Sequence, residues 1–141
     1  MPRWERTIEI NAAPEKVWSV LSDIERWPEW TPSMLSVKLV DDGPLAPGTK
    51  AIVHPKGTVE STWTVSEVTP NRSFTWDTKV RGARTVGGHE ISPTAGGSRV
   101  TLSIVVDGFA AKLLKPIIGR TITTNMDQEA EGLKRVSEAA A

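Results

Sequence analysis

The sequence predicts an α+β domain in which a curved antiparallel sheet of about seven strands wraps around a long C-terminal helix. Through most of the chain apolar residues alternate with polar ones, which is typical of half-buried strands. After Gly108 the apolar spacing changes to nearly four residues, which is typical of an amphipathic helix. Turn-forming segments separate the strands and leave no room for crossover helices, so neighbouring strands should be antiparallel.

The N-terminal part of the chain predicts a strand followed by two short helices. Residues 3–10 alternate between the two faces of an extended chain, which indicates the first strand. Pro14 suits the first turn of a helix, and apolar residues then recur at helical spacing up to Ile24. Asp23 can cap a second short helical turn, which we expect Pro28 to end.

The remainder of the chain predicts six further strands and one long helix. The strands are separated by turns rich in Gly, Pro, Asn and Asp. They span residues 35–40, 49–54, 58–68, 73–80, 83–91 and 98–106. From Phe109 onward, the helix carries an apolar stripe formed by Leu114, Ile118, Ile122, Met126, Ala130, Leu133 and Val136. Pro116 either kinks this helix or separates a short first turn from its main body.

Length and composition restrict the class of protein. The chain has 141 residues, so we interpret residues 1–141 as a single domain. Cysteine is absent, which excludes disulfide bonds and thiolate metal sites. The formal net charge is zero, so there is no electrostatic basis for binding nucleic acid. No run of about 20 apolar residues and no apolar signal segment is present, so we expect no membrane span and a cytoplasmic location. The sequence leaves monomer and homodimer open.

Few residues in this sequence are suited to acid–base chemistry. Only His54 and His89 ordinarily titrate near neutral pH. His89 and Glu90 are adjacent on a predicted strand, so their side chains point to opposite faces and cannot pair. Strand parity places His89 inward, where it is either a backbone-bonded core histidine or a catalytic candidate. The sequence contains no metal-ligand cluster, phosphate-binding loop or nucleophile motif, so we expect no metal and no other cofactor.

Tryptophan usage points to an internal cavity. The chain has six tryptophans and no tyrosine. Trp63 and Trp76 lie on the inward faces of consecutive predicted strands, and small residues such as Gly119 leave room between helix and sheet. These side chains either line a pocket or pack against each other and fill it. The residues expected to bind a ligand are Trp27, Trp30, Met34, Trp63, Trp76, His89, Ile118, Ile122, Thr123 and Met126.

Several separated segments carry a family resemblance. They are residues 8–18 (IEINAAPEKVW), 21–23 (LSD), 27–30 (WPEW), 47–49 (PGT), 63–70 (WTVSEVTP) and 96–101 (GGSRVT). In these segments the chain resembles the START-like (SRPBCC) helix-grip superfamily, in particular the polyketide cyclase/dehydrase family. The resemblance implies a sheet gripping the long helix around a cavity whose entrance lies near the short helices and hairpin loops.

The resemblance implies more than one function. The first hypothesis is binding of a small hydrophobic or aromatic ligand, such as a lipid or a polyketide-like compound. The alternative is a polyketide cyclase or dehydratase that uses the same cavity, with His89 as its catalytic candidate. A third is a regulatory or stress-related interaction domain without turnover. Because the sequence shows no acid–base pair, it favours binding over catalysis and leaves enzymatic activity open.

Overall fold

The computed structural model describes residues 2–139, apart from the side chains of Phe109, Ala110 and Lys112. Seven strands form one antiparallel sheet in the order β1-β7-β6-β5-β4-β3-β2. The strands are β1 Arg3–Ile10, β2 Met34–Leu39, β3 Lys50–Pro55, β4 Ser61–Thr69, β5 Ser73–Val80, β6 Ala83–Thr94 and β7 Gly97–Asp107. The helical elements are α1 Pro14–Leu21, the 3₁₀ turn η1 Ile24–Arg26, α2 Trp27–Trp30 and α3 Phe109–Ala139.

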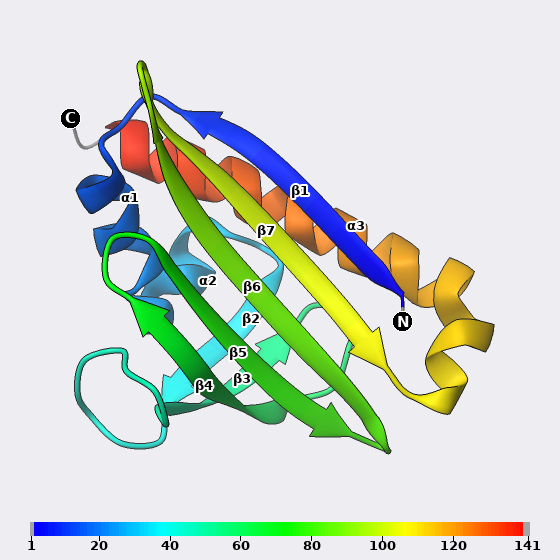
Figure 1. Cartoon of the computed structure of the whole chain (residues 1–141). Coiled ribbons are helices and arrows are strands. Elements are labelled where there is room, and N and C mark those ends of the chain that lie inside the picture. Colours follow the sequence, from blue (N-terminus) through cyan, green and yellow to red (C-terminus); the bar gives the residue numbers. More distant parts are fainter. Residues whose placement is uncertain (1, 140–141) are drawn as a thin grey trace.

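The curved sheet wraps around α3, as predicted (Figure 1). Strands β2 to β7 follow one another as hairpin neighbours, and β1 joins β7, so β1 and β2 form the two edges. The long helix packs mainly against β1 and β7, on one side of the concave face. The short helices lie between the sheet and the C-terminal half of α3 (Figure 1). The α+β fold class predicted from the periodicity is therefore confirmed.

Two prolines behave differently from simple helix terminators. Pro28 was expected to end a helical turn, but it lies in the first turn of α2. Backbone N–H groups in the first turn of a helix have no partner within the helix, so a proline there removes no hydrogen bond. Pro116 lies inside α3, which continues through it. The first turns of α3 point away from the axis of the rest of the helix (Figure 1). Of the two alternatives for Pro116, the structure therefore shows a bend within one helix.

The close approach of α3 to α2 depends on Gly132. A Cβ atom at this position would collide with the backbone carbonyl of Trp30 and would lie 2.9 Å from its ring. The same carbonyl oxygen accepts a hydrogen bond from Arg135, at 3.0 Å. Glycine at position 132 thus lets the helix pack directly on the α2 backbone.

Charged side chains attach the C-terminal end of α3 to β1. Lys134 donates hydrogen bonds to the backbone carbonyl of Glu9 (2.9 Å) and to the Glu138 carboxylate (2.7 Å). The same Glu138 oxygen accepts a hydrogen bond from the Asn11 N–H, at 2.8 Å. One carboxylate therefore connects the last turns of the helix to the end of the first strand.

Glu138→Gln should lower the melting temperature at neutral pH but not in strong acid. The hydrogen bond from Lys134, followed by that from the Asn11 N–H, holds the pKa of Glu138 below its ordinary value. A depressed native pKa stabilises the folded state above the unfolded-state pKa, and this contribution is lost as pH falls through the native pKa. Between neutral pH and strong acid, the difference in Tm between wild type and E138Q should be full above the ordinary pKa of a glutamate and should shrink as pH falls through the lowered native pKa.

Thermal unfolding followed by circular dichroism across this pH range checks the prediction. Glu131→Gln, at an exposed carboxylate of the same helix, is the matched control and should show no such pH-dependent difference. A Tm difference for E138Q that persists unchanged in strong acid contradicts the assignment.

Candidate functional site

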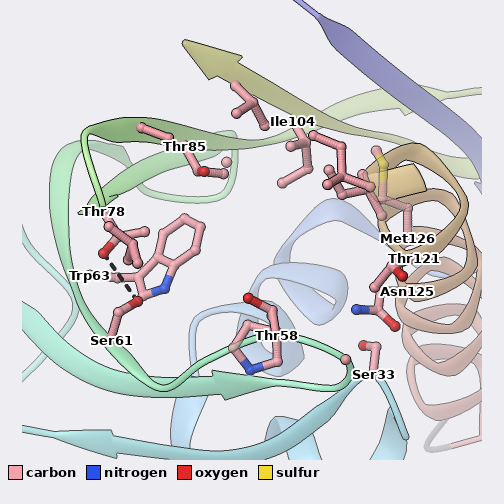
Figure 2. Close-up of a pocket in the computed structure, with 18 of the residues that line it drawn as sticks. Ser33, Thr58, Ser61, Trp63, Thr78, Thr85, Ile104, Thr121, Asn125 and Met126 are labelled. Atoms are coloured by element: carbon pink, nitrogen blue, oxygen red, sulfur yellow. Dashed lines mark hydrogen bonds between the residues drawn. The ribbon is translucent and has the colours of Figure 1, made fainter. Parts of the chain in front are cut away.

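A cavity of about 540 Å³ lies between the sheet and α3. Its walls come from β4 to β7 on one side and from α3 on the other, and the loop between β3 and β4 adds to the rim. Figure 2 shows Trp63 and Thr78 of the sheet on one side of this space and Asn125 and Met126 of α3 on the other. The volume falls within the range of about 300–1,000 Å³ that is usual for small-molecule sites.

The structure brings eight of the ten predicted ligand-binding residues to this cavity. Trp63 and Trp76 are neighbours with ring centroids 5.3 Å apart, and Trp27 of α2 lies 5.4 Å from Trp76. All eight line one continuous space: Trp27, Met34, Trp63, Trp76, His89, Ile118, Ile122 and Met126. Contact of these residues with a ligand stays a prediction.

The other two predicted residues lie elsewhere. Trp30 is buried against Trp27 and Gly132, where α3 crosses α2. The Thr123 hydroxyl donates a hydrogen bond to the Gly119 carbonyl, at 2.9 Å, within its own helix. Gly119 itself faces the Trp4 ring of β1, so the expectation that it gives room to the cavity is wrong. The helix is rotated so that Thr121, and not Thr123, lines the cavity.

The mouth of the cavity carries exposed apolar side chains. Val59, Leu114 and Ile117 line the cavity and are 44%, 44% and 71% exposed, respectively. The mouth therefore lies between the β3–β4 loop and the first turns of α3, with Arg81 of the β5–β6 turn nearby. The hairpin loops surround it as the resemblance implied, whereas α2 supplies the buried Trp27 to the interior.

Some of the polar groups that line the cavity are hydrogen-bonded within the protein. The Thr78 hydroxyl donates to the Thr62 carbonyl at 2.8 Å and lies 3.1 Å from the Ser61 hydroxyl (Figure 2). On the helix side, the Asn125 amide donates to the Lys56 carbonyl, at 2.9 Å. The buried Trp63 indole N–H has no hydrogen-bond partner among residues 2–139.

A buried histidine and a buried glutamate face each other in the cavity wall. His89 points inward from β6 and Glu90 points outward, as strand parity predicted. His89 Nε2 lies 3.8 Å from Glu129 Oε1 of α3, and the two side chains are 5% and 10% exposed. The His89 ring stacks on Phe74 at 4.1 Å and lies 5.5 Å from the Trp27 ring.

The hydrogen bonds of His89 define what the pair can do. Its Nδ1 lies 3.2 Å from the Phe74 carbonyl oxygen, which can only accept, so Nδ1 carries a hydrogen. In a neutral ring Nε2 would then present a lone pair to the Glu129 carboxylate, which is repulsive. One additional proton, on Nε2 or on the carboxyl group, makes the contact attractive. His89 and Glu129 therefore place an imidazole and a carboxyl group, which are side-chain types used in general acid–base catalysis, opposite each other in the cavity wall.

Glu129, which lines the cavity and faces His89, is a candidate residue that the sequence analysis did not name. The partner of His89 comes from α3 and not from the adjacent residue. Position 129 follows Ile122 and Met126 at helical spacing and precedes Leu133 by four residues, so it belongs to the apolar stripe. A charged residue inside that stripe was the available signal.

Neither a metal centre nor a membrane-spanning helix is found in the described part of the chain. Among residues 2–139, no three His, Cys, Asp or Glu side chains gather in a way that could hold a metal ion. No helix within residues 2–139 has the length and apolar character needed to cross a bilayer.

Comparison with known proteins gives a family match and several fold matches. The profile of the family described as polyketide cyclase/dehydrase and lipid transport matches residues 1–138. A search of curated proteins finds no match. The structure is similar to the protein TTHA0849 from Thermus thermophilus, with a TM-score of 0.79, 18% identity and 99% of each chain covered.

Two further solved structures share the fold. A START superfamily protein from Mycobacterium smegmatis superposes with a TM-score of 0.78 at 16% identity, covering 99% of both chains. The di-domain ARO/CYC protein StfQ of the steffimycin biosynthetic pathway gives a TM-score of 0.78 at 13% identity. That match covers 98% of this chain and 51% of StfQ. At these identities the similarity shows the fold.

Gly87→Ala should reshape the cavity by displacing a tryptophan. A Cβ on Gly87 would lie 3.0 Å from Trp76 Nε1 and 3.1 Å from Trp76 Cδ1, so the indole must move. Overpacking of this kind typically costs about 1–3 kcal/mol. Urea unfolding and the near-ultraviolet circular dichroism of the tryptophans measure both effects.

Gly96→Ala is the matched control, because nothing lies within 4 Å of the Cβ it would add. If G87A is as stable as G96A and has an unchanged near-ultraviolet spectrum, the close packing of Gly87 on Trp76 is wrong.

Proposed function

Because this chain belongs to the polyketide cyclase/dehydrase and lipid transport family, we propose that its cavity binds a small hydrophobic or aromatic ligand. The observation that carries the proposal is the cavity of about 540 Å³ with an aromatic interior and an apolar mouth. A preformed space of this size is what a ligand site requires. The family's description as lipid transport proteins supports the same class of ligand.

Apolar burial would supply most of the affinity. Transfer of apolar surface from water contributes about 25 cal/mol per Å². A ligand that buries about 200 Å² would thus gain about 5 kcal/mol before the costs of association. The Trp63 and Trp76 rings meet at 45° and 5.3 Å, and they offer faces and edges for a planar ligand. Exposed Ile117 and Val59 would offer an entering apolar molecule an apolar surface at the mouth.

Filling the cavity should abolish binding. The apolar fluorophore N-phenyl-1-naphthylamine should bind the wild-type protein and gain fluorescence by energy transfer from the tryptophans. Thr85 lines the cavity, so Thr85→Phe should weaken binding at least about tenfold, which corresponds to about 1.4 kcal/mol. Thr75 lies between the inward-facing Phe74 and Trp76 in the sequence of β5, so its side chain points to the opposite face of the sheet. Thr75→Phe therefore adds the same ring outside the cavity and should leave binding unchanged.

Fluorescence titration with both variants tests the proposal. A wild-type protein that fails to bind this probe or other apolar probes, or equal weakening by T85F and T75F, refutes it. Circular dichroism of both variants establishes that each is folded.

A cyclase or dehydratase acting in the same cavity is the second candidate, and the His89–Glu129 pair favours it. Aldol cyclisation of a poly-β-keto chain needs a base that removes an α-proton and an acid that protonates the attacked carbonyl oxygen. A new carbon–carbon bond forms in that step, and subsequent dehydration releases one water. His89 and Glu129 supply one base and one acid within an enclosed space, which is the minimum for this chemistry.

Catalysis of this kind should depend on both members of the pair. With a linear 3,5,7-triketo thioester as the probe, C2 can attack the C7 carbonyl to close a six-membered ring, and mass spectrometry would follow the loss of one water from the substrate. Glu129→Gln and His89→Gln should each lower the rate by about 10²–10⁴-fold. Turnover no faster than in buffer, or rates unchanged in both variants, would exclude this candidate and leave ligand binding intact.

A further inference from the structure

The gap between His89 and Glu129 is a polar feature of the cavity wall that no direct hydrogen bond closes. Their facing atoms, Nε2 and Oε1, are 3.8 Å apart, which is too far for a direct hydrogen bond. Among residues 2–139 no side chain or backbone group donates a hydrogen bond to the Glu129 carboxylate. A buried carboxylate normally receives hydrogen bonds on its oxygens, because burial removes those from water. Both residues line the cavity, so the missing partner can come from its contents.

The chemistry of the gap selects one type of partner group. His89 Nε2, when it carries the shared proton, is a donor, and the carboxylate oxygen is an acceptor. A hydroxyl group both accepts and donates, and its oxygen can lie about 2.8 Å from both atoms, to the cavity side of the line joining them. A carbonyl group could satisfy His89 but would leave Glu129 without a donor. A ligand carboxylate would face the charge of Glu129 at close range, which is unfavourable.

The residues around the His89–Glu129 pair indicate the shape and polarity of the rest of the ligand. The His89 ring is enclosed by the rings of Phe74, Trp27 and Trp76, with centroid distances of 4.1, 5.5 and 6.1 Å. Met126, which lies close to Glu129 on the same helix, also lines the space. Aromatic and apolar groups therefore surround the His89–Glu129 pair. This arrangement fits a neutral, flat molecule with one hydroxyl group at its inner end.

We propose that the His89–Glu129 pair recognises the hydroxyl group of an uncharged hydroxyaromatic ligand. The ligand hydroxyl donates a hydrogen bond to the Glu129 carboxylate and accepts one from His89 Nε2. This inference rests on the proposed function, because it names the chemical class of the molecule that the cavity binds. The pair would favour such ligands over simple hydrocarbons, which cannot form hydrogen bonds with it. It would also favour them over fatty or aromatic acids, whose carboxylates Glu129 repels. The pair would fix the orientation of the ligand, while the aromatic rings supply the burial.

Three probes with the same ring system test this proposal by isothermal titration calorimetry at neutral pH. They are 2-naphthol, naphthalene and 2-naphthoate. The wild-type protein should bind 2-naphthol at least about tenfold more tightly than naphthalene and should bind 2-naphthoate most weakly, since one charge-assisted bridging hydrogen bond accounts for a difference of this size.

Two substitutions of Glu129 separate its two effects. Glu129→Met, which keeps the side-chain length without the carboxylate, should remove the preference for 2-naphthol over naphthalene. Glu129→Gln should remove the repulsion and raise the affinity for 2-naphthoate at least about tenfold. Because each variant answers a different question, the loss of folding in one leaves the other as a test. Glu131→Gln, at an exposed carboxylate of the same helix, is the control and should keep the wild-type order.

The outcomes distinguish this inference from the proposed function beneath it. Equal affinity of the wild-type protein for 2-naphthol and naphthalene overturns the hydroxyl proposal, while the cavity remains a ligand site. The hydroxyl proposal is also overturned if E129M still prefers 2-naphthol over naphthalene and E129Q binds 2-naphthoate no more tightly than the wild-type protein does. Failure of all three probes to bind overturns both the hydroxyl proposal and ligand binding by this cavity.

Discussion

The buried indole of Trp27 is the contact on which the rest of the structure depends. Its N–H donates to the Leu21 carbonyl at 2.9 Å, so the short helix that carries it is fixed to the end of α1. Its ring lies within 6.1 Å, between centroids, of Phe74, Trp76 and His89 on the inner face of β5 and β6. A single side chain thus joins the short helices to the middle of the sheet. It also orders the aromatic wall in which the polar pair is embedded.

The cavity follows from how the remaining concave surface is covered. The long helix packs mainly on β1 and β7, because small Gly119 admits the Trp4 ring of β1 against the helix. That placement leaves much of the inner face of β4 to β6 facing open space, although Glu129 of α3 approaches His89 of β6 to 3.8 Å. Gly87 and Thr85 on β6 are also too small to fill that space. A sheet that curves around a helix held to one side therefore encloses a space.

The fold could be predicted from the sequence because it depends on periodicity. The change from a period of two to nearly four at Gly108 located the long helix, and strand parity placed His89 inward and Glu90 outward. The site was predicted only in part, because its residues depend on the rotation of α3 about its axis. That rotation, which brings Thr121 and not Thr123 to the cavity, is set by the packing of Gly132 on α2 and of Gly119 on Trp4. Contacts between such distant segments leave no periodic signal.

Packing and stability do not explain why position 129 carries a carboxylate. A buried ion pair usually adds little stability compared with apolar residues of the same volume, because each charge loses its hydration. An apolar residue at position 129 would therefore complete the stripe between Met126 and Leu133 at no cost to the fold. The carboxylate instead places a polar group opposite His89, among the aromatic rings that surround that histidine, and open to the cavity. For the proposed ligand function, such a group would act on selectivity, since an unsatisfied buried donor or acceptor penalises every occupant that cannot bond to it. The cavity that we propose as a ligand site would thus combine non-directional apolar attraction with a directional contact at the His89–Glu129 pair, which would orient the bound molecule.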